Sequence, residues 1–131
     1  MVDHPWTVVA PPVGDREYLA LITHLPLKRF RMITRFLRFS GAISRQLEGT
    51  HGLLGFSFRA KILARDFYTL SVWEDEQALD DFVRAEPHRG TMGTMRPHMA
   101  GTKFVRWTVK GTEVPPSWEI AVRRLQGIPP G

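Results

Sequence analysis

Residues 54–83 read LGFSFRAKILARDFYTLSVWEDEQALDDFV. In residues 54–62 large apolar side chains alternate with small or polar ones, which is the two-residue period of a β-strand. A short turn at 64–66 precedes a second apolar run, 67–73, so the two runs predict a β-hairpin. The acidic residues 74–76 then favour the start of a helix, because the helix dipole stabilises negative charge there.

Similar patterns on either side of the hairpin supply the remaining elements. Residues 18–25 form an apolar run closed by Pro26, which predicts a first strand. Apolar residues recur at helical spacing over 29–47, and Gly49 follows as a stop signal. Residues 103–109 alternate again and predict a last strand.

The order of these elements is strand, helix, strand, strand, helix, strand. This βαββαβ order is typical of a ferredoxin-like α+β fold, in which four strands form an antiparallel sheet with both helices on one face. We expect the second helix to end or bend at Pro87, and residues 88–101 to form either a short irregular helix or a loop. Ser117 is a candidate N-cap and predicts an extra C-terminal helix over 118–125.

The chain therefore divides into three parts. Residues 1–16 are rich in Pro and Gly and predict an N-terminal arm. Residues 17–110 form the ferredoxin-like domain, and residues 111–131 form the C-terminal helix and a tail. A length of 131 residues with 43% hydrophobic content fits one folded domain.

Composition excludes several classes of site and partner. The absence of cysteine excludes disulfides, thiolate metal sites and cysteine nucleophiles. No signal peptide and no apolar run of about 20 residues is present, so we expect a cytoplasmic protein without a membrane partner. The formal net charge is +5, and the densest basic run lies between Lys28 and Arg38 on the predicted first helix. We interpret it as a solvated helix face, with an anionic ligand or partner as the alternative, and expect no nucleic acid partner.

The strands carry apolar residues on more than one face. A sheet that is apolar on both sides needs a second covering layer, and a second copy of the chain would supply it. We expect a homodimer that packs through the face turned away from the helices, with Phe58, Tyr68, Leu70 and Val105 on that face. The C-terminal helix could instead cover the sheet by itself and leave a monomer.

The hairpin and the helix after it carry a resemblance to a known family. The strand ends in Trp73-Glu74, an acidic helix with Leu79 and Phe82 follows, and His88 comes after Pro87. This pattern resembles the antibiotic-biosynthesis-monooxygenase superfamily, which implies a dimeric α/β barrel built from ferredoxin-like domains. The superfamily includes cofactor-independent monooxygenases of polyketide quinols, haem-degrading enzymes and proteins without a known activity.

The sequence departs from the active sites of that superfamily. It contains no asparagine, whereas the haem-degrading members combine Asn, Trp and His, and Thr69 stands where the quinol monooxygenases have an Asn four residues before the Trp. His88 follows Trp73 by 15 positions, which is longer than the spacing of the haem-degrading members. Neither set of catalytic residues is complete here.

The candidate site residues surround His88. An imidazole in a ligand cleft can accept a proton from a phenol or quinol, so His88 is the candidate catalytic residue. We expect a small aromatic or polycyclic ligand to contact further residues, each of which has a structural role as its alternative: Trp73, His24, Met92, Met95 and His98. No histidine spacing supports a metal site.

Three functions follow from these residues. The first is a monooxygenase-like enzyme that oxidises its substrate without a cofactor. The second is a haem-binding protein with His88 as the axial ligand. The third is a dimeric domain that binds a small ligand without catalysis.

Overall fold

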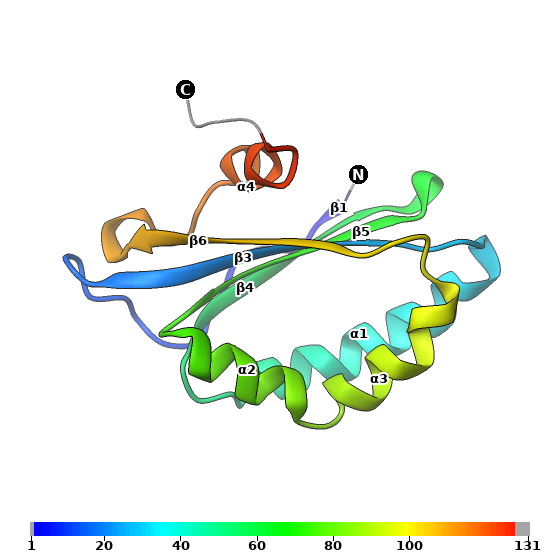
Figure 1. The fold of residues 1–131 in the computed structure, drawn as a ribbon, viewed down its shortest axis with the longest axis horizontal. Coiled ribbons are helices and arrows are strands. Elements are labelled where there is room, and N and C mark those ends of the chain that lie inside the picture. The colour runs from blue at the N-terminus through cyan, green and yellow to red at the C-terminus, as the bar shows by residue number, and fades with distance from the viewer. Residues whose placement is uncertain (1, 128–131) are drawn as a thin grey trace.

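The computed structural model describes residues 2–127 and shows one antiparallel sheet between two layers of helix (Figure 1). The order of the main strands across the sheet is β4-β5-β3-β6, which is the ferredoxin-like order that the sequence predicts. These strands are β3 (Glu17–Pro26), β4 (Leu53–Lys61), β5 (Asp66–Trp73) and β6 (Lys103–Lys110). The predicted tail residues 128–131 lie outside the described residues.

The N-terminal arm adds two short strands to the edge of this sheet. Both β1 (Val2–Asp3) and β2 (Thr7–Val8) pair with β4 in the antiparallel sense. With only two residues each, they are too short to show a two-residue period in the sequence.

The helices divide between the two faces of the sheet (Figure 1). One face is covered by α1 (Ile33–Glu48), α2 (Glu76–Arg84) and α3 (His88–Met95). The opposite face, called the outer face below, carries α4 (Trp118–Leu125). Short 3-10 turns complete the chain: η1 (Phe30–Met32), η2 (Ile62–Ala64), η3 (Arg96–His98) and η4 (Gly111–Glu113). Residues 88–101, for which the sequence allowed either a short helix or a loop, begin with the helix α3 followed by the turn η3.

Side-chain caps fix the starts of two helices. The Asp75 carboxylate accepts a hydrogen bond from the backbone N–H of Ala78 at 2.9 Å, which caps α2. The Ser117 hydroxyl accepts from the N–H of Ile120 at 3.1 Å and caps α4. The predicted N-cap at Ser117 is confirmed, because the cap depends only on residues close in sequence.

Two apolar clusters lie between the sheet and the helices on the inner face. The cluster beneath α1 and α2 contains Leu47, Leu53, Phe56, Trp73, Leu79 and Phe82. The cluster beneath α1 and α3 contains Leu25, Leu27, Met32, Phe36, Phe67, Met95 and Met99. Together they hold the three inner helices against the sheet.

A third cluster lies on the outer face. Ala121 and Leu125 of α4 are buried against strand residues that include Tyr18, Ala20 and Trp107. Part of the cover that the sequence analysis assigned to a second copy therefore comes from this chain itself. Tyr68, Leu70 and Val105 belong to this face as predicted.

The prediction for Phe58 is wrong. Phe58 is paired with Thr69 and packs in the cluster beneath α1 and α2, on the inner face. Alternation along β4 separates the phenylalanines from Gly55, Ser57 and Arg59, but it does not say which set faces the helices. The phenylalanines face the helices, and Gly55 on the outer face leaves room for Trp6 of the arm.

Gly52 holds the turn before β4 against the start of α2. Its backbone has φ +88°, its carbonyl accepts from the N–H of Glu74 at 2.7 Å, and an added Cβ would lie 2.5 Å from the Cβ of Ala78. Gly101 has a similar φ of +104° with open space around it. Both positions are in the left-handed region that favours glycine.

These two glycines make a matched pair for a stability measurement. Gly101→Ala should lower the free energy of unfolding by about 1–2 kcal/mol, the cost of a left-handed backbone. Gly52→Ala should lower it by roughly 2–5 kcal/mol, because overlap with Ala78 is added to the same backbone cost. Urea denaturation of both variants measures the difference, and equal losses would contradict the close contact.

Candidate functional site

His88 is the first residue of α3, and both its backbone and its imidazole ring are hydrogen-bonded to neighbouring helices. Its N–H donates to Oε1 of Gln46 in α1 at 3.0 Å. Its Nδ1 lies 3.2 Å from the carbonyl oxygen of Val83 in α2. A carbonyl oxygen only accepts, so we assign the ring proton to Nδ1, and the lone pair then lies on Nε2.

Burial decides the charge of this histidine. The His88 side chain is half-buried, and desolvation lowers its pKa below the ordinary value of 6.5, while the hydrogen bond to Val83 opposes the shift with a smaller effect. The imidazole is therefore mainly neutral near pH 7. A neutral ring with its lone pair on Nε2 is a proton acceptor at that pH.

Aromatic contacts connect His88 with Trp73. The centroids of the His88 and Phe82 rings are 4.9 Å apart, and those of Phe82 and Trp73 are 5.2 Å apart. Trp73 itself is 1% exposed, and its Nε1–H donates to the hydroxyl of Ser71 at 2.8 Å. The indole is thus a satisfied core side chain, and Phe82 lies between it and the imidazole.

The two candidate methionines share a helix face with His88. Met92 and Met95 follow it by four and seven positions, the spacing of side chains along one face of a helix. Met95 is buried and Met92 half-buried in the cluster beneath α1 and α3. His98 lies in η3, where its carbonyl accepts from the N–H of Lys28 at 2.9 Å.

His24 lies on the other side of the sheet. Its Nε2 is 2.9 Å from Oδ1 of Asp66, and its ring stacks on Tyr68 with centroids 4.7 Å apart. Its strand partners Tyr68 and Lys103 place it on the outer face. The structure therefore brings His88, Met92 and Met95 to one side of the sheet and separates His24 from them.

Gln46 is a site residue that the sequence analysis did not identify. Besides accepting from His88, its Nε2 donates to the carbonyl of Phe82 at 3.4 Å. One amide therefore connects α1 with the end of α2 and the start of α3. Because 42 residues separate it from His88, no local pattern in the sequence indicates this contact.

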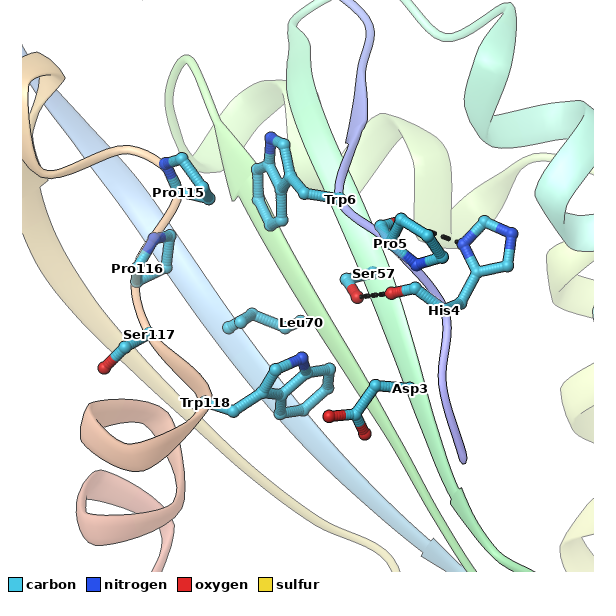
Figure 2. Close-up of a pocket in the computed structure, with 10 residues that line it drawn as sticks. All are labelled: Asp3, His4, Pro5, Trp6, Ser57, Leu70, Pro115, Pro116, Ser117 and Trp118. Atoms are coloured by element: carbon cyan, nitrogen blue, oxygen red, sulfur yellow. Dashed lines mark hydrogen bonds between the residues drawn. The ribbon is translucent and has the colours of Figure 1, made fainter. Parts of the chain in front are cut away.

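A pocket of about 280 Å³ opens on the outer face of the sheet (Figure 2). It lies between the N-terminal arm, strands β4 and β5, and the segment that leads into α4. Its lining residues are Asp3, His4, Pro5, Trp6, Ser57, Leu70, Pro115, Pro116, Ser117 and Trp118. None of the residues predicted for the site is among them.

Close contacts of the arm and α4 shape this pocket. The Trp6 indole lies on Gly55, where an added Cβ would be 2.5 Å from its Nε1. The Arg59 guanidinium donates two hydrogen bonds to the Asp3 carboxylate, at 2.7 and 2.9 Å, and lies 4.7 Å from the centre of the Trp118 ring. Arg59 lowers the pKa of Asp3, so the carboxylate is ionised and the guanidinium balances its negative charge. The pocket therefore has largely apolar walls with a neutralised ion pair at its rim.

The sequence holds one indication of this pocket. Trp6 is a large apolar side chain in an arm otherwise rich in Pro and Gly, and such a residue commonly docks on the body of the domain. Its partner surface, Gly55, lies in another element and could not be assigned from the sequence.

Within residues 2–127, no three side chains of the types that bind metals are grouped so as to hold an ion. No helix in this part of the chain is long and apolar enough to cross a membrane.

Comparison with known proteins relies on structure, because no protein-family profile and no curated protein matches the sequence. A presumed antibiotic biosynthesis monooxygenase from Caulobacter crescentus is 15% identical, with a TM-score of 0.59 over 74% of this chain and 92% of its own. Another, from Nitrosomonas europaea, is 13% identical, with a TM-score of 0.61 over 68% and 95%. This chain has the fold of the antibiotic-biosynthesis-monooxygenase-like proteins. At these identities the likeness establishes the fold alone.

Some structures with this fold are longer than the present chain. A presumed monooxygenase from Fusobacterium nucleatum is 13% identical, with a TM-score of 0.67 over 79% of this chain. The chain spans only 48% of that protein's length. Taken together, these structures confirm, at the level of the fold, the resemblance carried by the hairpin and the helix after it.

The lowered pKa of His88 predicts a pH dependence of stability. The unfolded chain takes up a proton near pH 6.5 and the folded chain at lower pH, so stability is lost as pH falls from about 6.5 through the folded pKa. Urea unfolding at about pH 7.5 and pH 5.5 should show a larger loss for the wild type than for His88→Gln. His51→Gln, at an exposed histidine, is the control and should behave like the wild type. A wild type that gains stability on acidification relative to His88→Gln would contradict this assignment.

Proposed function

We propose that the protein is a monooxygenase-like enzyme in which His88 accepts a proton from a small aromatic or polycyclic substrate. The observation that carries this proposal is the state of the imidazole. Nδ1 is engaged with the Val83 carbonyl, burial favours the neutral ring, and Nε2 has no hydrogen-bond partner among the described residues. The monooxygenase-like fold supports the same choice.

The reaction needs only a substrate with an acidic C–H and molecular oxygen. Nε2 removes the proton, the carbanion transfers electrons to O₂, and a C–O bond forms to give a peroxide. The imidazolium returns its proton to the peroxide, which then loses water as its O–O bond breaks. For anthrone the balance is one anthrone and one O₂ to one anthraquinone and one water, with no cofactor consumed.

The proposed substrate surface runs along α3. Met92, half-buried on the same helix face as His88, provides an adaptable apolar contact for a flat molecule, and Met95, which is 1% exposed, supports it from the core. His98 ends the same segment in η3. Trp73 lies behind Phe82, and His24 lies across the sheet, so we place neither in direct contact with the proton acceptor.

Haem binding is the alternative use of the same nitrogen, with Nε2 of His88 as the axial ligand. The pocket of about 280 Å³ lies on the opposite face of the sheet, so a porphyrin in that pocket would not reach Nε2. The proposed reaction needs no haem, because the carbanion reduces O₂ directly. A Soret band in the purified protein that is lost in His88→Ala would favour haem binding instead.

Oxygen uptake in the presence of anthrone tests the enzyme, after subtraction of the rate in buffer. We expect an uptake that rises with pH and is half-maximal below pH 6.5, because the neutral imidazole is the active form. His88→Ala should lower the rate by about 10²-fold or more, the usual contribution of a general base. His51→Ala is the matched control and should keep the rate of the wild type.

A second candidate function is supported by the pocket on the outer face. Its Trp6 and Trp118 side chains provide flat apolar surfaces, and the pocket lies apart from His88, as expected for ligand binding without catalysis. Melting temperatures measured with and without anthrone, beside the oxygen uptake, separate the two functions. If anthrone raises the melting temperature without oxygen uptake, and Trp118→Ala abolishes that rise, binding without catalysis is favoured and the enzyme is contradicted.

We also propose that two copies of the chain pair through the end of the outer face that α4 leaves uncovered. Tyr68 and Val105 lie there, half-buried at the border of the outer cluster, with His24 between them across β3. Since α4 already covers the rest of this face, the interface is smaller than a bare sheet would provide.

Light scattering at micromolar concentration tests this pairing. The wild type should have a mass about twice the 15.0 kDa of one chain. Val105→Asp should give the single-chain mass, because it places a charge in the interface. Thr108→Asp, on the inner side of the same strand, should remain paired. A wild-type mass near 15 kDa would show that α4 is sufficient cover.

A further inference from the structure

One end of the molecule exposes apolar side chains from two neighbouring turns. The hairpin turn η2 between β4 and β5 presents Ile62 and Leu63, which are 39% and 90% exposed, and η1 before α1 presents Phe30, which is 53% exposed. Both turns lie at the same end of the molecule (Figure 1). A leucine exposed to 90% at the tip of a hairpin contributes nothing to the core of the chain.

Arg65 joins the two turns into one surface. Its carbonyl accepts from the N–H of Leu27 at 2.9 Å, and its guanidinium lies 4.9 Å from the centre of the Phe30 ring. It adopts the left-handed conformation with φ 57°, which closes the hairpin turn. The exposed apolar side chains of Phe30, Ile62 and Leu63 therefore belong to one patch.

Basic residues surround this patch. We name the whole surface the basic tip; besides the three apolar side chains it contains Lys28, Arg29, Arg31, Lys61 and Arg65. None of these five cations takes part in the ion pairs found within residues 2–127. The nearby acid Asp66 is paired with His24. The sequence from 27 to 47 contains no acidic residue at all.

Acidic residues gather at the opposite end of the inner layer. The segment from Glu74 to Glu86 carries six of them: Glu74, Asp75, Glu76, Asp80, Asp81 and Glu86. The start of α2 lies on the far side of the molecule from η1 and η2 (Figure 1). This separation of charge orients the chain in front of a negatively charged surface, with the basic tip first.

We propose that the basic tip docks on an anionic lipid surface. Leu63, Ile62 and Phe30 would enter the boundary between headgroups and acyl chains, and the surrounding Lys and Arg would contact anionic headgroups. The sequence analysis set membranes aside because no segment is long enough to span one, but docking from one side needs no span. A nucleic acid would match the charge and leave the protruding leucine without a role, so we favour lipid.

Sedimentation of the full chain with vesicles tests this proposal. Vesicles of phosphatidylcholine alone are compared with vesicles in which about a third of the lipid is phosphatidylglycerol, at about 0.1 M salt. The partition coefficient should be roughly ten-fold higher with the anionic lipid. Leu63→Asp and the double variant Arg29→Glu, Arg31→Glu should each reduce it by about ten-fold.

Two controls make the result specific. Ile120→Asp places the same charge on another exposed apolar side chain, which lies in α4 and is 47% exposed, and it should sediment like the wild type. The melting temperature of Leu63→Asp should stay unchanged, because the side chain is exposed. Oxygen uptake with anthrone does not involve the tip, so failure of one proposal is distinguishable from failure of the other.

Three outcomes would overturn the proposal. The first is a wild type that sediments with neither vesicle. The second is equal sedimentation of wild type and Leu63→Asp, which would show adsorption through charge alone. Such adsorption would not distinguish a lipid surface from a nucleic acid or an acidic protein. The third is a change of mass in light scattering for Leu63→Asp, which would assign Leu63 to an interface between two copies of the chain.

Discussion

A four-stranded sheet that is apolar on both faces imposes the main constraint on this protein. Each face has to be covered, and the chain does so with different segments. Three helices cover the inner face over two apolar clusters, and α4 together with the N-terminal arm covers much of the outer face. The layered arrangement in Figure 1 is the direct result.

This constraint also separates the candidate functions. His88 belongs to the inner layer, where Gln46 ties three helices together at the start of α3. The pocket between Trp6 and Trp118 belongs to the outer layer, which exists because the arm and α4 extend the ferredoxin-like core at its two ends. A ligand in that pocket would have the whole sheet between itself and the imidazole. The proposed catalysis at His88 and the proposed binding in the pocket would therefore be independent of each other.

The ends of the sheet carry the surfaces available to partners. On the outer face, α4 leaves one end of the sheet uncovered near Tyr68 and Val105, and the hairpin turn with Leu63 extends beyond it. The polar features at this end are mostly basic, while the acidic residues gather around α2. The molecule is therefore asymmetric, with the proposed proton acceptor in the inner helical layer and the basic tip at one end.

The sequence alone determined what depends on neighbouring residues. The hairpin, the order βαββαβ, the acidic start of α2 and the Ser117 cap all follow from patterns a few residues long. It also determined His88 as a candidate, although only through a resemblance. It could not decide which alternating set of β4 faces the helices, and Phe58 was placed on the wrong side for that reason.

The tertiary structure decided what depends on residues far apart in the chain. Gln46 and His88 are 42 positions apart and share a hydrogen bond only because α1 and α3 pack on the same face. Trp6 packs on Gly55 because β4 has no side chain at that position. Leu63 is exposed because its hairpin extends past the sheet. Local patterns fix the conformation of a segment, whereas its neighbours are fixed by which apolar faces are buried together.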